Sequence, residues 1–345
     1  MTALSILWFF LVFLLIAGYF ILDGFDLGAV ILYTFITKDQ REQAIVRRAI
    51  GPVWDGNEVW VLTAGGALFA AFPDAYATTF SGFYLAIMLV LFALIVRAVS
   101  FEFWGADSKW RPLWNWCFFL GSLLPALLYG VAIGNVIAGI PMDAYGNYIG
   151  IPLLGLITPF TLLCGLLGLA MFICAGACWI ALKAPAGSEI EARAAKLRMP
   201  MQIIALGLFF VTTIIMFVMM GGTVEMTPEL APLRWIFAAL FVVCLLVSLI
   251  IGRTKENGSL LAFLCQSVSA CALVFLVAFS MFPVLVMASP DSIGGPITVL
   301  SAGSSELSLF CMTVILCIGL PLVLLYHVII YRTFRGRITD EDLAH

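Results

Sequence analysis

The chain has 345 residues, of which 63% are hydrophobic and only 11% are charged, whereas an ordinary soluble domain is about half apolar and about a quarter charged. So few charged side chains cannot form the polar surface of a soluble protein. Most of the chain must therefore be surrounded by lipid or by another membrane subunit. The net charge of −3 and the lack of a basic stripe exclude nucleic acid as a partner.

Nine apolar stretches are long enough to cross a membrane, which takes about 20 residues. In chain order, the predicted membrane helices are 4–35, 52–72, 78–97, 113–137, 151–182, 200–220, 233–251, 260–286 and 307–331. Only short loops rich in proline, glycine and charge separate them. The sequence therefore predicts an all-α integral membrane protein with one polytopic domain over residues 1–345. Two four-helix bundles plus one extra helix fit the count.

The basic residues predict the orientation of these helices. Of the 17 lysines and arginines, all but Arg234 fall on alternate connections or in the C-terminal tail. Loops that face the cytoplasm carry the excess of basic residues in membrane proteins. The N-terminus is therefore expected outside the cytoplasm and the C-terminus inside. A missing or additional helix would disrupt this sorting.

One pair of acids, Asp23 and Asp26, lies in the first predicted helix. The spacing of three residues places both carboxylates on one helix face. Gly24 and Gly28 lie beside them and form a small-residue face that another helix can approach closely. Carboxylates within a membrane span are costly, so they are functional candidates by default.

A second pair, Asp55 and Glu58, lies at the start of the second predicted helix. The apolar stretch 59–72 is too short to span the membrane alone, so this helix must begin near Pro52, at the cytoplasmic boundary. A carboxylate in the first helical turn is also stabilised by the helix dipole, which is an alternative explanation for Asp55. That explanation is weaker for Glu58, which lies one turn deeper.

These four acids lie on the predicted cytoplasmic side, as does Arg97 at the inner end of the third predicted helix. Arg97 is a candidate ion partner for one of them. The acids form either the mouth of a proton path or a buried ion-pair cluster that holds the first three helices together. The residues alone favour neither interpretation.

Other polar residues give weaker signals. Gly130 and Gly134 form a second close-packing face, and the amide of the adjacent Asn135 is expected to hydrogen-bond a neighbouring helix. The chain has only two histidines, His327 and His345. A bis-histidine haem needs two axial ligands on facing helices, so no metal or haem ligation is expected within this chain, and no catalytic residue is predicted.

Several motifs resemble subunit II of the cytochrome bd family of quinol oxidases. They fall in order over the first 140 or so residues. The motifs are Asp23–Gly28, Gly51–Trp60, Thr63–Pro73, Ser81–Ala86, Arg97–Glu102, Gly121–Ser122 and Gly130–Asn135. The second half of the chain matches the family in length, hydropathy and number of predicted helices, without a motif of similar specificity.

The resemblance implies a subunit of a respiratory terminal oxidase in a bacterial or archaeal cell membrane. In that family a partner, subunit I, carries the haems, here haems b and d, and quinol electrons reduce dioxygen to water with protons from the cytoplasm. This chain is then expected to support subunit I and to contribute a proton path and dioxygen access. A bound quinone or lipid, surrounding membrane lipids and a small third subunit are further expected partners.

For individual residues, the resemblance favours the proton-path interpretation of Asp55 and Glu58, with Asp23 and Asp26 ranked behind them. A different class of function remains as an alternative. In a proton- or ion-coupled transporter the same acids would form the coupling site, and discontinuous helices with an inverted repeat would be expected. A scaffold in which every acid is merely paired is the third possibility.

Overall fold

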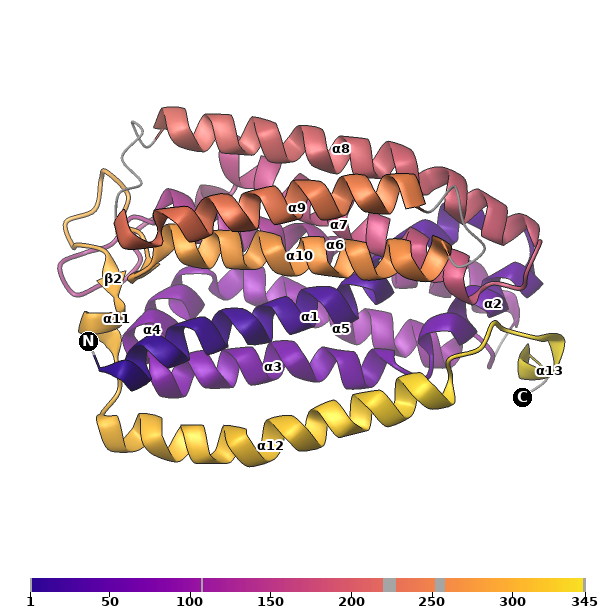
Figure 1. The fold of residues 1–345 in the computed structure, drawn as a ribbon, viewed down its shortest axis with the longest axis horizontal. Helices are drawn as coiled ribbons and strands as arrows, with labels where there is room; N and C mark the ends of the chain where they lie inside the picture. Colours follow the sequence, from indigo (N-terminus) through magenta and orange to yellow (C-terminus); the bar gives the residue numbers. More distant parts are fainter. Residues whose placement is uncertain (1, 107, 220–227, 252–257, 344–345) are drawn as a thin grey trace.

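The computed structural model describes residues 2–106, 108–219, 228–251 and 258–343, which are mostly helical (Figure 1). Long helices run side by side along the longest axis, and the two chain ends lie at opposite ends of the molecule. The α-helices are α1 (Ala3–Ile36), α2 (Gln40–Ile50), α3 (Trp54–Ala71), α4 (Pro73–Gly82), α5 (Tyr84–Phe103), α6 (Arg111–Ala138), α7 (Pro159–Lys183), α8 (Glu189–Met219), α9 (Ala231–Ile251), α10 (Gly258–Met281), α11 (Val299–Ala302), α12 (Glu306–Thr333) and α13 (Asp340–Leu343). Three short 3₁₀ turns are Ser108–Trp110, Leu154–Leu156 and Pro228–Leu230, and strands β1 (Val284–Val286) and β2 (Ile297–Thr298) pair antiparallel.

Eight of the described helices are long and apolar enough to cross a membrane, namely α1, α5, α6, α7, α8, α9, α10 and α12. The second expected span, α3, is not among them. It has only 18 residues, and its first turns carry Asp55, Asn57 and Glu58. The fold is therefore that of a multi-helix membrane protein. The count of nine spans and the orientation stay predictions.

The third predicted helix, 78–97, is displaced at both ends. Phe72 leaves the helical conformation, and Pro73, which has no amide hydrogen to donate, starts the separate helix α4. Helix α5 then begins at Tyr84 and carries Arg97 in its interior. Arg97 does not end the helix, because carboxylates of two other helices neutralise its charge there.

Two other predicted helices are too long at one end. The prediction 151–182 starts too early, because α7 begins at Pro159, where the preceding threonine caps the helix by accepting a hydrogen bond from a backbone amide. The prediction 260–286 extends too far, because the chain leaves α10 at Met281 and enters strand β1. A proline between the two elements cannot donate a helical hydrogen bond.

The prediction 200–220 starts too late. Helix α8 begins at Glu189, before the apolar stretch, and Arg193 pairs with Glu189 one turn away. Such a spacing stabilises a polar helix that continues beyond the membrane. The five remaining predicted helices agree with α1, α3, α6, α9 and α12 within two residues at each end.

Helix α1 is the central element of the fold. It packs against α3, α6, α7 and α10, while α5 pairs with α6, and α9 pairs with α10. Helix α12 lies at the edge of the molecule and packs mainly against α1 and α3 (Figure 1). The predicted division into two four-helix bundles plus one extra helix stays a prediction.

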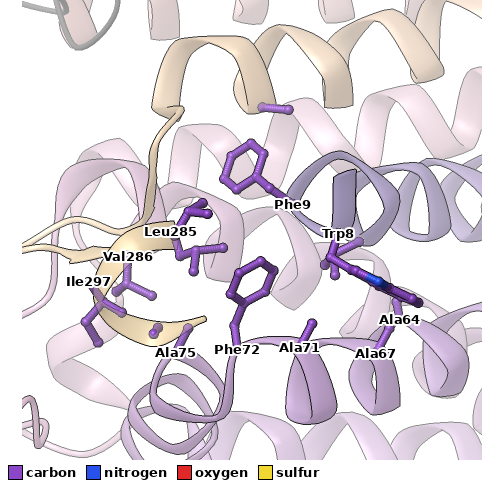
Figure 2. Close-up of a cluster of buried hydrophobic side chains, with 14 of the residues drawn as sticks. Trp8, Phe9, Ala64, Ala67, Ala71, Phe72, Ala75, Leu285, Val286 and Ile297 are labelled. Carbon is purple, nitrogen blue, oxygen red and sulfur yellow. The ribbon is translucent and has the colours of Figure 1, made fainter. Parts of the chain in front are cut away.

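A cluster of buried apolar side chains fixes α1, α3 and the β-hairpin at the end that carries α4 and α11 (Figure 2). Trp8 and Phe9 of α1 and Phe72 after α3 supply its aromatic rings, and small side chains of α3 leave room for them. The small residues are Ala64, Ala67 and Ala71. The indole nitrogen of Trp8 donates to the backbone carbonyl of Leu309 at 3.1 Å, so the cluster also anchors α12.

The opposite end of the molecule carries α2 and α13 and is called the α2 end below (Figure 1). Ion pairs connect the polar segments there. Arg41 in α2 pairs with Asp340 in α13, and Arg193 in α8 pairs with Glu42 in α2. These exposed or partly exposed pairs contribute little stability individually, so their main effect is to position the segments.

Candidate functional site

A buried arginine joins three helices. Arg97 in α5 donates to both carboxylate oxygens of Asp23 in α1, at 2.9 and 3.2 Å, and to Oε1 of Glu58 in α3 at 3.2 Å. The side chains of Arg97 and Asp23 are 1% and 0% exposed, whereas that of Glu58 is 23% exposed. A guanidinium fork matches the two oxygens of a carboxylate, which makes this pair both strong and directional. The arrangement ties α1, α3 and α5 together at one point.

A glycine of the neighbouring helix makes room for this arginine. A Cβ added at Gly121 of α6 would lie 2.8 Å from the backbone nitrogen of Arg97 and 2.7 Å from the carbonyl oxygen of Ala93. Without a side chain at that position, α6 covers the backbone of α5 closely. The ion pairs are thereby kept away from water, which strengthens the attraction between the charges.

Asp26 lies one turn after Asp23 on α1 and is fully buried. Its Oδ2 accepts a hydrogen bond from Nδ2 of Asn57 in α3 at 2.7 Å, and Oδ1 of Asn57 accepts one from the hydroxyl of Tyr331 in α12 at 3.1 Å. The other oxygen of Asp26 is buried without a hydrogen-bond partner in the described part of the chain. A water molecule or the acid's own proton would satisfy that oxygen.

Asp23, Asp26, Asn57, Glu58 and Arg97 are called the acid cluster below. It contains three carboxyl groups and one guanidinium. With all groups ionised, the cluster would hold an excess of negative charge in a buried region, which is strongly unfavourable. Bound protons would remove that excess. The cluster can therefore store protons, and Glu58 connects its buried part with a more accessible surface.

Asp55, ranked with Glu58 from the sequence, lies outside this cluster. It is exposed in the first turn of α3, and its carboxylate makes no hydrogen bond or ion pair within the described residues. Its position fits the helix-dipole explanation. Asp55 therefore lies one turn before Glu58, at the exposed start of α3, and is not a member of the buried network.

Aromatic hydroxyls and a histidine border the acid cluster. The hydroxyl of Tyr19 in α1 donates to that of Tyr129 in α6 at 3.0 Å. In α12, Nε2 of His327 accepts a hydrogen bond from the indole of Trp60 at 3.3 Å, and Nδ1 lies 2.8 Å from the carbonyl oxygen of Val323. This network assigns the neutral tautomer with its proton on Nδ1.

Four polar residues of the site region were not predicted from the sequence, namely Asn57, Tyr19, Tyr129 and Tyr331. One signal was available for Asn57. It begins a series of buried positions along α3 that continues with Trp60 and Ala64 at helical spacing, so periodicity places it on the inner face. The tyrosines carry no comparable signal, because a tyrosine in an apolar helix usually serves packing.

The glycine faces predicted from the sequence are close helix contacts. A Cβ at Gly28 would lie 1.7 Å from a backbone oxygen of α7, and one at Gly24 would lie 2.7 Å from the ring of Phe172. Gly130 and Gly134 of α6 similarly face α7, with 2.5 and 2.9 Å to the nearest atoms. The amide of Asn135 donates to carbonyls of its own helix and of the loop before α7 at 2.8 Å.

No group of three or more His, Cys, Asp and Glu side chains is placed to hold a metal ion among the described residues. His327 uses both ring nitrogens within the chain, and His345 lies outside the described residues. The haem-free state of this chain stays a prediction.

Comparison with known proteins decides the family. The family model described as cytochrome bd terminal oxidase subunit II matches residues 4–334. The chain belongs to this family. It is 33% identical to subunit 2 of cytochrome bd-I ubiquinol oxidase from Escherichia coli over 99% of this chain and 96% of the relative. It is also 33% identical to subunit 2 of cytochrome bd ubiquinol oxidase from Bacillus subtilis, over 99% of both chains.

A solved structure shares the fold. The bd oxidase from Geobacillus thermodenitrificans contains a chain that matches this one with a TM-score of 0.73 over 96% of this chain and 99% of the other, at 17% identity. The fold described above is thus one that occurs in bd oxidases. The resemblance seen in the first 140 or so residues extends over nearly the whole chain.

Proposed function

We propose that this chain is subunit II of a membrane oxidase that transfers electrons from quinol to dioxygen and forms water. The observation that carries the proposal is the family match over residues 4–334, together with relatives named as ubiquinol oxidase subunits. In this assignment a partner, subunit I, holds haems b and d and performs the redox chemistry. The present chain supports that partner in a bacterial cell membrane. Family membership favours this assignment over a transporter.

The second part of the proposal is a proton path through the acid cluster. Protons enter from the α2 end by way of Asp55 and Glu58 and reach Asp23 and Asp26. The excess of carboxyl groups over cations, the partial exposure of Glu58 and the unpartnered oxygen of Asp26 support this route. Proton relays in membrane proteins use buried carboxylates of this kind.

The third part assigns the outer face of α3 to the contact with subunit I. An exposed stripe on α3, beyond its first turn, combines apolar and polar positions, namely Val59, Leu62, Thr63, Gly66 and Phe69. Lipid is a poor environment for a face that also carries Glu58 at its edge, and α3 is not apolar enough to be a span by itself. Another protein subunit can contact both the apolar and the polar positions of this face.

A tryptophan substitution tests that contact. Leu62→Trp adds bulk to the exposed face of α3. If subunit I packs against this face, the larger side chain is expected to weaken the association by about 1–3 kcal/mol. Ile250→Trp on α9 is the matched control, because lipid accommodates bulk; the two side chains are 69% and 58% exposed. We expect about tenfold less subunit I to co-purify with the first variant and no loss with the second. Equal partner content would place the interface elsewhere.

The fourth part concerns a large apolar cavity among α1, α6, α7, α8, α9 and α10. Its volume is about 550 Å³, and its lining includes Phe13, Thr212, Met216 and Trp235. A quinone or a lipid tail is the class of ligand that such a cavity accommodates. The same cavity offers dioxygen, a small apolar molecule, a way into the protein from the membrane.

A spectrum of the purified complex tests the proposed function. We expect a tag on this chain to isolate a complex with a partner of similar size, haem bands in the reduced-minus-oxidised spectrum, and oxygen uptake driven by quinol. A small third subunit would be visible in the same preparation. A pure, folded chain without haem or large partner would contradict the oxidase assignment and favour the transporter.

A further inference from the structure

A pocket of about 170 Å³ lies at the α2 end, outside the acid cluster. It is formed where α2, α7 and α12 meet the C-terminal segment 334–338 and α13. A water molecule in the liquid occupies about 30 Å³, so the pocket exceeds one water several-fold. Three basic and three aromatic side chains contribute to its lining. They are Arg48, Lys183, Arg337, Trp179, Tyr331 and Phe334.

Lys183 is the feature that points to a ligand. The residue is only 6% exposed, and its ammonium group donates to the carbonyl oxygens of Phe334 and Gly336. No carboxylate lies within ion-pair distance of it in the described part of the chain. The C-terminal dipole of α7 offsets the charge in part. A buried cation held only by neutral groups still favours an anion beside it.

Two arginines add positive charge around the lysine. Arg48 has no carboxylate within ion-pair distance among the described residues, and its guanidinium lies 6.0 Å from the centre of the Phe334 ring. Arg337 uses one nitrogen for Glu191 and for the carbonyl of Ala184. The acidic side chain in the lining, Asp342, accepts two hydrogen bonds from the threonine just before α13 and interacts electrostatically with Arg48. Three cationic side chains against this one carboxylate leave an excess of positive charge in the lining.

The position of the pocket indicates where an anion would come from. The membrane helices α7 and α12 both end at its walls. Trp179 and Tyr331, in the last turns of these helices, belong to its lining, and aromatic residues are frequent at the level of lipid headgroups. Tyr331 is held in place by its hydrogen bond to Asn57, so this wall is ordered before any ligand arrives.

We propose that this pocket binds a phosphate group through Arg48, Lys183 and Arg337, and that the headgroup of an anionic phospholipid supplies it. Basic pockets between membrane helices recognise such headgroups. The planar guanidinium groups match the phosphate oxygens, and the lysine adds a point charge. The acyl chains lie along the exposed apolar side of α12, where Val328 and Ile329 are 58% and 53% exposed. The inference does not depend on the oxidase assignment.

Lipid retention by the purified complex tests the proposal. The complex is exchanged into lipid nanodiscs of phosphatidylcholine with a minor fraction of phosphatidylglycerol and is then extracted with detergent. Mass spectrometry counts the lipids that remain bound. The test variant is Arg48→Gln with Arg337→Gln. The control is Arg332→Gln with Arg335→Gln, which removes two exposed charges at the same end but outside the pocket lining. A single Arg48→Gln variant leaves the pair between Arg337 and Glu191 intact.

Loss of two cations is expected to weaken the preference for phosphatidylglycerol about 30-fold, and the control is expected to match the unmodified complex. Calorimetric titration with inorganic phosphate separates the two sources of the group. If the unmodified complex binds phosphate, the test variant does not, and neither prefers phosphatidylglycerol, the phosphate site would be retained and its assignment to a lipid headgroup would be overturned. Equal lipid retention and equal phosphate binding in all variants would overturn the proposal altogether.

Discussion

Replacing Arg97 with glutamine is expected to destabilise the protein by about 3–5 kcal/mol, because removal of one partner of a buried ion pair leaves the other charge uncompensated. Asp23, fully buried, would lose the one ion partner that it has among the described residues, and Glu58 would lose its pair with the same arginine. The expected loss in the free energy of unfolding also reflects the lost contacts by which the guanidinium joins α1, α3 and α5. Thermal unfolding of the purified complex, followed by circular dichroism, measures the change.

Two companion variants separate charge from geometry. Arg97→Lys keeps the charge and loses the fork that contacts both oxygens of Asp23, so we expect an intermediate loss of stability. Arg97→Gln with Asp23→Asn removes both charges of the closest pair and is expected to recover a large part of the loss. If the single glutamine variant unfolds at the temperature of the unmodified protein, the arginine does not hold the three helices together.

The composition and the acid positions are sufficient to predict much of this site. A 63% hydrophobic chain makes every carboxylate inside or at the edge of a span exceptional, and this selects Asp23, Asp26, Asp55 and Glu58. It also selects Arg97 as their counter-ion. The sequence does not tell which acid the arginine contacts, since that depends on the rotation of α5 about its axis. The structure places it against both Asp23 and Glu58.

The ranking of Asp55 with Glu58 illustrates what local position leaves out. On α3 the positions of Asp55, Val59 and Leu62 follow one helical stripe, and all three are exposed, whereas Asn57 and Trp60 follow the opposite, buried stripe. Distance along the chain from the membrane boundary suggested that both acids belong to one group. The helical period places Asp55 and Glu58 on the same side of α3, and what separates them is that Glu58, at the edge of the exposed stripe, lies within reach of Arg97 in α5. The period would have identified Asn57, which lies on the buried side.

The ends of the helices were harder to predict, because hydropathy does not distinguish an apolar helix from an apolar loop. The segment before α7 and the strand after α10 are as hydrophobic as the helices that they adjoin. Conversely, α8 begins at Glu189, before its apolar stretch, because local ion pairing stabilises the polar turns there. Prolines and capping threonines carried the missing information at the first two places.

Asp26→Asn is expected to lower quinol-driven oxygen uptake about tenfold or more, because an amide cannot accept and release the proton that a relay must carry. Asparagine has nearly the shape of aspartate and can still accept the hydrogen bond from Asn57, so haem content and partner content should stay unchanged. Asp26→Glu restores a carboxyl group and should recover part of the uptake. A larger solvent isotope effect in the slow variant would identify proton delivery as the limiting step.

Asp55→Asn provides the contrast that separates a relay from a structural cluster. The carboxylate of Asp55 is exposed and unpaired among the described residues, so water can substitute for it as a proton donor, and uptake is expected to stay within about twofold, as for surface positions in general. Normal uptake in a stably assembled Asp26→Asn complex would instead reduce the acid cluster to a structural ion-pair network. In that case the role of Arg97 would remain, since the buried charge of Asp23 requires a counter-ion whether or not protons pass beside it.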